Sequence, residues 1–212
     1  MKPFICKDCV QCCTEFGSTN GTGYLPVYEW ELVILKDLAN KNNIDLKIKP
    51  VTVLYDKISK QTFCVVYGIF NSPCIFLKNN KCSIYKSRPL VCKSYPLFWS
   101  PDYKQVITKS CFGLCPNIDH DEFLSNIKGM NKDEIKKYFK KIYGDTYKNC
   151  NQSNRINLAL TDLLKGLEKD KKIFLEELYS KDYPKDIISL TEFLLNNKLV
   201  SKKELEELRK NI

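Results

Sequence analysis

The amino-acid sequence predicts an α+β protein with two regions of different character, residues 1–116 and residues 121–212. Ten of the eleven cysteines fall in the first region. Proline interrupts this region repeatedly, so it is expected to be irregular, with a small β-hairpin and short helices. In the second region Lys and Glu alternate with Leu and Ile at helical spacing, which predicts an all-helical part. The two regions are expected to form either two domains or one.

Three elements are expected near the start of the chain. A helix should run from about residue 28 to residue 38. Strand-like alternation follows at residues 44–48 and 51–55, and a β-rich run at residues 62–70 could pair with the preceding stretch as a hairpin. The apolar face of the helix would consist of Trp30, Val33, Ile34 and Leu38.

The second region carries three helical signals. One helix should start at Asn131 and end near Gly144. A longer apolar pattern with helical spacing runs from Ser153 to Leu178. A capping box, Ser201 with Glu204 three residues later, should open a short terminal helix. The charges along these helices are interpreted as solvated faces.

Composition excludes several classes of protein. The longest apolar run, residues 63–70, is far shorter than the ~20 residues that a membrane helix needs. The start of the chain lacks the pattern of a secretory signal, which predicts a cytosolic protein whose thiols stay reduced. Clustered cysteines there indicate metal ligands or redox catalysts. His120 is the sole histidine, which argues against histidine-based zinc sites and removes the commonest general base.

The sharpest motif is Cys6-Lys-Asp-Cys9-Val-Gln-Cys12-Cys13. Cysteines three residues apart allow a tight loop to direct several thiolates at one centre, as iron–sulfur loops do. A pair of this spacing would also suit zinc. Adjacent side chains usually diverge, so Cys12 and Cys13 are not expected to serve one ion equally, and one of them could turn to a second site.

A second cysteine group follows at Cys74, Cys82 and Cys92. The pair Asn79-Asn80 predicts a tight turn that brings Cys74 near Cys82 across a hairpin. Ser87-Arg88-Pro89 resembles an N-cap followed by proline in the first helical turn, which would place Cys92 near a helix start. Arg88 could neutralise a negatively charged thiolate site. Cys111 and Cys115 lie further along the chain.

The two cysteine groups and their Ile84-Tyr85 and Arg88-Pro89 landmarks resemble the CxxCxxCC cysteine-cluster family, the YkgJ-like zinc- or iron-chelating domain. The resemblance covers about residues 4–116. Cys111-Phe-Gly113 matches the family's late Cys-Pro-Gly motif except at the proline. The resemblance implies a metal site, either iron–sulfur or zinc. The matching cysteines are Cys6, Cys9, Cys12, Cys13, Cys74, Cys82, Cys92 and Cys111.

Two functions from different classes follow. The first is a cytosolic iron–sulfur protein with at least one [4Fe–4S] cluster, held in part by Cys6, Cys9 and Cys12, with a redox or cluster-assisted role. Flagellin lysine N-methylase, a larger relative with a similar cysteine region, suggests an enzyme that modifies a protein side chain, although no S-adenosylmethionine motif is recognisable. The second is a zinc-stabilised module whose net charge of +9 meets an acidic protein or a nucleic acid.

Three cysteines stay outside this set. These residues act either as small buried hydrophobic side chains or as thiol nucleophiles, and they are Cys64, Cys115 and Cys150. None of them has an obvious acid–base partner in the sequence. The Gly17–Gly23 stretch lacks a preceding strand and the Lys-Ser/Thr ending of a P-loop, so it is interpreted as a loop. The reaction, the substrate and the oligomeric state are not specified by the sequence.

Overall fold

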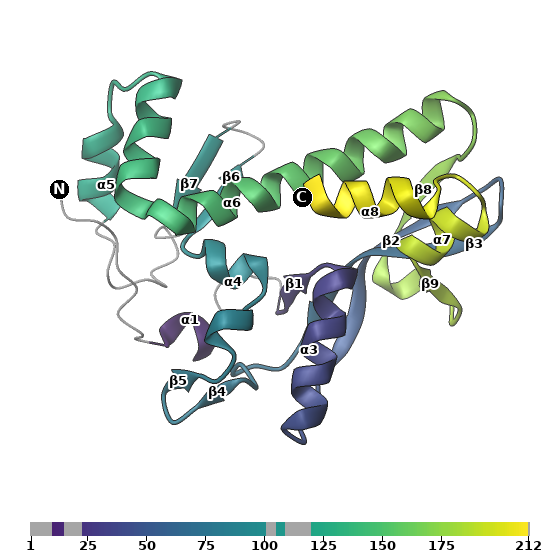
Figure 1. Cartoon of the computed structure of the whole chain (residues 1–212), viewed down its shortest axis with the longest axis horizontal. Coiled ribbons are helices and arrows are strands. Elements are labelled where there is room, and N and C mark those ends of the chain that lie inside the picture. Colours follow the sequence, from purple (N-terminus) through teal and green to yellow (C-terminus); the bar gives the residue numbers. More distant parts are fainter. Residues whose placement is uncertain (1–9, 15–22, 101–104, 109–119, 212) are drawn as a thin grey trace. The chain divides into compact units, whose positions relative to one another are not determined.

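The computed structural model describes residues 10–14, 23–100, 105–108 and 120–211, which form a mixed α+β fold (Figure 1). The chain divides into two compact units, and neither is continuous in sequence. Unit 1 comprises Met1–Leu25 and Phe70–Asn154, and unit 2 comprises Pro26–Ile69 and Arg155–Ile212. The predicted α+β class is confirmed. The predicted boundary after residue 116 falls in a stretch that the structure does not describe, so it stays a prediction.

Unit 2 is built on a sheet. Its central strands, β2 (Ile48–Asp56) and β3 (Gln61–Ile69), form the predicted antiparallel hairpin. β2 begins only at Ile48, so residues 44–47 do not make a separate strand. The sheet order is β1-β3-β2-β8, and β9 also pairs with β3, in parallel. The outer strands are β1 (Leu25–Val27), β8 (Leu175–Leu178) and β9 (Ile187–Ser189).

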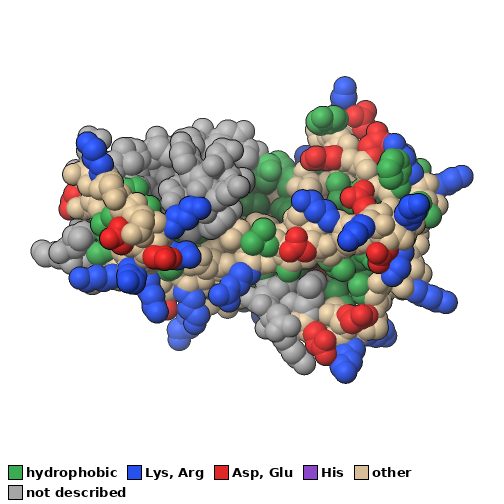
Figure 2. All heavy atoms as spheres, turned by 90° about the horizontal axis from the view of Figure 1, so that it is seen from above, with side chains coloured by type: hydrophobic (Ala, Val, Ile, Leu, Met, Phe, Trp, Pro, Cys, Tyr) green, Lys and Arg blue, Asp and Glu red, His purple; other side chains and the backbone are tan. Residues whose placement is uncertain are grey.

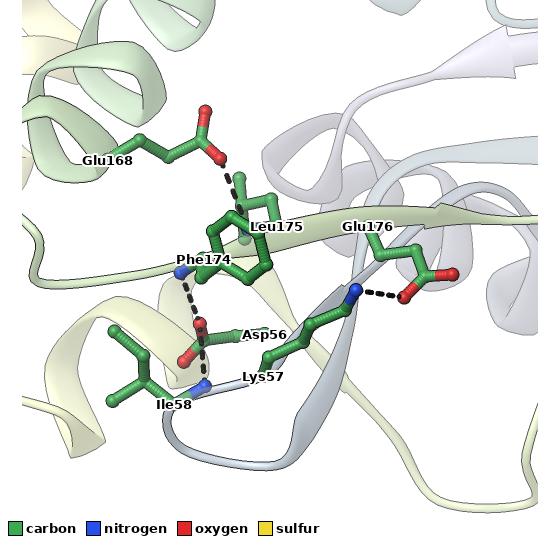
Figure 3. Close-up of polar contacts among 7 residues, drawn as sticks. All are labelled: Asp56, Lys57, Ile58, Glu168, Phe174, Leu175 and Glu176. Carbon is green, nitrogen blue, oxygen red and sulfur yellow. Dashed lines mark hydrogen bonds and ion pairs between the residues drawn. The ribbon is translucent and has the colours of Figure 1, made fainter.

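The prediction of an all-helical C-terminal part is wrong, because β8 and β9 are strands of this sheet. The helical pattern stops at Lys169, and Lys171 adopts a left-handed φ of 57° that turns the chain. The buried carboxylate of Asp56 then accepts a hydrogen bond from the backbone N–H of Phe174 at 2.7 Å and fixes the start of β8 (Figure 3). The spacing of Leu175 and Leu178 fits a helix as well as a short strand, so periodicity could not separate the two.

Helices complete unit 2 around one apolar core. The ring of Phe63 on β3 stacks on that of Phe193, with 4.0 Å between the centroids. The predicted capping box is present, because the backbone N–H of Glu204 donates to the Ser201 hydroxyl at 3.2 Å and the backbone N–H of Ser201 donates to the Glu204 carboxylate at 2.7 Å. The helical elements are α3 (Glu29–Lys41), the second half of α6 (Lys132–Lys169), η3 (Ser180–Asp182), α7 (Leu190–Asn196) and α8 (Lys202–Asn211).

The predicted apolar face of α3 is wrong. The buried residues of this helix are Leu32, Leu35 and Ala39, whereas Val33 and Ile34 are exposed. The run from Leu32 to Leu35 is apolar at every position, so its periodicity does not select a face. The start of the helix is as predicted, since the backbone N–H of Tyr28 donates to the Glu31 carboxylate at 3.0 Å.

Unit 1 contains short elements and one helical hairpin. Its elements are α1 (Gln11–Thr14), β4 (Leu77–Lys78), β5 (Lys81–Cys82), η1 (Tyr85–Ser87), α4 (Leu90–Ser94), β6 (Leu97–Ser100), β7 (Gln105–Thr108), α5 (His120–Ile127) and the first half of α6. Non-helical φ and ψ at Gly144 interrupt α6, at the position where the sequence predicts a helix end. The apolar core of the unit consists of Leu97, Tyr138, Phe139, Ile142, Tyr143 and Cys150. Across the described ranges, the search for a helix long and apolar enough to cross a membrane finds none.

Candidate metal centre

Cys12 and Cys13 lie on α1, a single helical turn that a tight loop sets up. Val10 adopts a left-handed φ of 53°, and its carbonyl accepts hydrogen bonds from the backbone N–H of Cys13 at 2.7 Å and of Thr14 at 3.1 Å. The two neighbouring thiols are therefore presented from one short turn, and both residues are half-buried.

Cys74 joins this turn although it lies about sixty residues further along the chain. Its backbone N–H donates a hydrogen bond to the carbonyl of Cys13 at 2.7 Å. Its own carbonyl accepts from the backbone N–H of Leu77 at 2.9 Å, which curls the chain into β4. The backbone bond holds the two cysteines side by side independently of their side chains.

The Cys13 thiol is hydrogen-bonded to the thiol of Cys12 and to that of Cys74. The hydrogen bond with Cys12 raises the pKa of Cys13 to about 12, and that with Cys74 acts in the opposite direction. The hydrogen bond with Cys13, followed by burial, raises the pKa of Cys74 well above its ordinary value. The Cys13 and Cys74 thiols therefore favour the protonated form, and a metal ion that binds them must displace protons.

Cys82 is carried by the predicted hairpin. Asn79 and Asn80 both have left-handed φ values, 49° and 56°, as a two-residue turn requires. Leu77 is paired with Cys82 across the strands. The backbone N–H and hydroxyl of Ser83 both donate to the carbonyl of Phe76, at 2.9 and 2.8 Å. The hairpin backbone is thus fixed on either side of the turn.

Cys92 lies in the first turn of α4, as predicted. The helix start differs in detail, because Pro89 occupies the N-cap position and Ser87 ends the preceding η1 turn. Burial raises the pKa of Cys92 well above its ordinary value, the charges of Cys74, Cys13 and Cys82 raise it further, and the charge of Arg88 lowers it. Four cysteines and Arg88 therefore act on one another in this part of unit 1.

Arg88 is oriented by Tyr85. The Arg88 Nε–H donates to the Tyr85 carbonyl at 3.1 Å, and the guanidinium carbon lies 3.7 Å from the centroid of the Tyr85 ring. Tyr85 and Ser83 are supporting residues that the sequence analysis did not assign a role. Only the three-residue spacing of Tyr85 and Arg88 could have indicated their contact.

Two described cysteines belong to apolar cores instead. Cys64 lies in β3 of unit 2, is fully buried, and has a thiol that donates to the carbonyl of Val66 at 3.1 Å. Cys150 lies in the aromatic core of unit 1. Burial raises the pKa of each to about 12, so neither is an activated thiol nucleophile.

Of the eight predicted ligands, the structure describes Cys12, Cys13, Cys74, Cys82 and Cys92. Cys6, Cys9 and Cys111 lie outside the described residues, as does Cys115. Among the described residues, no three Cys, His, Asp or Glu side chains are grouped so as to hold a metal ion by themselves. The donor chemistry nevertheless fits zinc or an iron–sulfur cluster, because cysteine thiols that lose their protons to a metal are the soft thiolate ligands that both prefer.

Comparison with known proteins identifies the family. No curated protein and no solved structure matches the chain. A family model matches residues 5–115, just over half of the sequence, and this range includes all eight predicted ligands. By this match the chain belongs to the CxxCxxCC family, which is described as "Putative zinc- or iron-chelating domain".

Proposed function

We propose that the protein is a cytosolic metalloprotein that binds one or two iron–sulfur clusters, with [4Fe–4S] as the cluster type. The proposed ligands are the eight cysteines of the two family motifs, with Cys6, Cys9 and Cys12 on the first cluster. The observation that carries the proposal is the meeting of the two motifs, because the Cys13 and Cys74 thiols are hydrogen-bonded and their backbones are joined at 2.7 Å.

A bound cluster would supply electron transfer or Lewis-acid chemistry at the thiolates. The chain's own residues supply the electrostatic surroundings of the cluster. The hairpin lobe, which we define as residues 74–93, places Arg88 where its positive charge favours the thiolate of Cys92. Positive charge beside thiolates stabilises the negatively charged complex that four thiolates form with a metal. Arg88 would therefore raise the affinity of the site and the potential of a redox-active cluster.

The packing of the hairpin lobe supports a structural contribution from the metal. Its buried apolar side chains are Phe76, Ile84, Pro89 and Leu90. Four buried apolar side chains are a small core for twenty residues, and metal–thiolate bonds would add to the stability of the lobe.

Zinc is the second candidate, because the family description names both metals and four thiolates suit zinc equally well. The test is anaerobic purification after expression in iron-replete medium, with a visible spectrum and elemental analysis of the same sample. The iron–sulfur proposal expects a brown protein with broad absorbance near ~400 nm and matching amounts of iron and sulfide. A colourless protein with one or two zinc ions would overturn it and establish the zinc alternative.

A further inference from the structure

The hairpin lobe carries positive charge and contains no acidic residue. Residues 57–101 contain seven Lys and Arg and no Asp or Glu, whereas the rest of the chain has 27 Lys and Arg against 25 Asp and Glu. Figure 2 shows both signs interspersed over much of the face that it draws. The hairpin lobe holds five of the seven cations: Lys78, Lys81, Lys86, Arg88 and Lys93.

These cations lie on a fixed backbone and reach solvent. Lys78, Lys81 and Lys86 are exposed, and they lie on β4, on β5 and in the η1 turn. The bonds from Ser83 to Phe76 hold the hairpin to the turn that follows it. Thiolates of a bound metal would offset part of the lobe's charge. Cys82 and Cys92 are partly buried, however, whereas the three lysines are exposed at the surface. The surface of the lobe therefore attracts anions.

Tyr85 and Arg88 add a planar platform to this surface. Tyr85 is 47% exposed although the Arg88 guanidinium lies over one face of its ring. The Arg88 Nε–H donates a hydrogen bond to the Tyr85 carbonyl, and this bond fixes the plane of the guanidinium. An exposed aromatic ring can stack on a nucleobase, and an oriented guanidinium can bind a phosphate. The pair thus offers both contacts within one turn of chain.

We propose that the hairpin lobe binds single-stranded nucleic acid, with Lys78, Lys81 and Lys86 contacting phosphates and Tyr85 stacking on a base. A nucleic acid supplies both the phosphates that the lysines attract and the planar rings that fit Tyr85. An acidic polypeptide without aromatic residues supplies the negative charge alone. The inference goes beyond the proposed metal function and rests on it in one respect, since a bound metal would hold the lobe folded.

The test uses the metal-loaded full chain and fluorescence anisotropy with a fluorescein-labelled single-stranded RNA of about fifteen nucleotides. Affinity is measured between about 50 and about 200 mM salt. A triple variant, Lys78→Ala, Lys81→Ala and Lys86→Ala, should weaken binding about tenfold or more and lower the salt slope by about two. Tyr85→Ala should weaken binding about fivefold or more while leaving the salt slope unchanged.

The control variant removes the same charge from unit 2. Lys165, Lys169 and Lys202 are exposed, and their replacement by Ala should leave affinity within about twofold. Absence of binding at low salt, or an equal loss in the control, overturns the proposal. Binding of polyglutamate as tight as that of RNA, with no effect of Tyr85→Ala, also overturns it and assigns the surface to an acidic protein. Metal content measured on each sample separates these results from failure of the metal centre.

Discussion

The carboxylate of Asp56 accepts a hydrogen bond from the backbone N–H of Phe174, 118 residues further along the chain, at 2.7 Å. The same carboxylate accepts from the backbone N–H groups of Ile58 and Ser59 and from the Ser59 hydroxyl, at 3.3, 2.8 and 2.6 Å. Asp56 is 1% exposed. One buried carboxylate thus closes the β2–β3 turn and attaches the first residues of β8 (Figure 3).

Replacement of Asp56 by Asn should destabilise unit 2 by about 1–3 kcal/mol, because the amide offers fewer acceptor sites to these donors. Urea unfolding at neutral pH measures the loss. The exposed ion pair of Lys57 with Glu176, 2.9 Å, provides a control on the same strands. Glu176→Gln should cost less than about 1 kcal/mol, and an equal cost for the two variants would contradict the role assigned to Asp56.

The stabilisation by Asp56 should depend on pH. Burial alone would raise its pKa, but the hydrogen bonds from Phe174, Ser59 and Ile58 outweigh burial and hold the pKa below its ordinary value. A lowered folded-state pKa contributes stability that is present above the unfolded-state pKa of about 3.9 and is lost as pH falls through the folded-state pKa. The difference in unfolding free energy between wild type and Asp56→Asn should therefore be constant from pH 7 to about 5 and shrink below about 4. A difference that grows on acidification would contradict this.

The metal centre makes a prediction about four cysteines. Cys13→Ser and Cys74→Ser should each lose most of the bound metal, because serine replaces a soft thiolate with a weak hydroxyl ligand. Cys64→Ala and Cys150→Ala, which change buried cysteines in the apolar cores, should keep the wild-type metal content. Metal per folded protein is measured by elemental analysis. Full metal retention in both Ser variants would exclude Cys13, the last cysteine of the CxxCxxCC motif, and Cys74 as ligands.

Replacement of two glycines of α6 by alanine should change the stability of the protein in opposite directions. Gly144 has φ 45° and ψ −118°, which alanine adopts only with strain, whereas Gly166 has ordinary helical geometry. An added Cβ meets no atom within 4 Å at either position, so steric clashes with neighbouring atoms do not contribute to the effect of either substitution. Gly144→Ala should destabilise the protein by about 1–3 kcal/mol, and Gly166→Ala should stabilise it by up to about 1 kcal/mol. Stabilisation by both would show that α6 is continuous through residue 144.

In a chain that ends at residue 115, the end of the family match, the β2–β3 hairpin should not be protected from hydrogen exchange. It lacks β8, β9 and α7, and Phe63 then loses the Phe193 ring stacked upon it at 4.0 Å. Isolated two-stranded hairpins are marginal in water. Hydrogen exchange at the amides of Phe63 and Cys64 should be slow in the full chain and fast in the fragment. Slow exchange in both would indicate that the hairpin is stable without the C-terminal segments.

The local chemistry of the turns was readable from sequence. Asn79 and Asn80 tolerate the left-handed φ that a two-residue hairpin needs, and Ser201 with Glu204 form their capping box without help from distant residues. The long-range contact between Cys13 and Cys74 could not be derived in this way. Both motifs were recognisable as ligand sets, but the backbone bond that joins them depends on how the intervening sixty residues fold.

Strands β8 and β9 escaped detection for a related reason. Each has at most four residues, which is too short for periodicity to identify. Their conformation is imposed by partners, Asp56 and β2 for the first and β3 for the second. The exposed positions of Val33 and Ile34 likewise reflect which face of α3 meets its neighbours, and four consecutive apolar residues contain no such information.

The interleaving of the two units has a consequence for synthesis of the chain. Phe63 leaves the ribosome about 130 residues before Phe193, which covers it in the finished protein. At about 5–20 residues per second, the apolar side of the hairpin is without that cover for roughly 6–26 s. Cys12 and Cys13 emerge before Phe63, and Cys74, Cys82 and Cys92 emerge within this interval, so metal can reach all five thiols of the nascent chain while its hairpin is a target for chaperones.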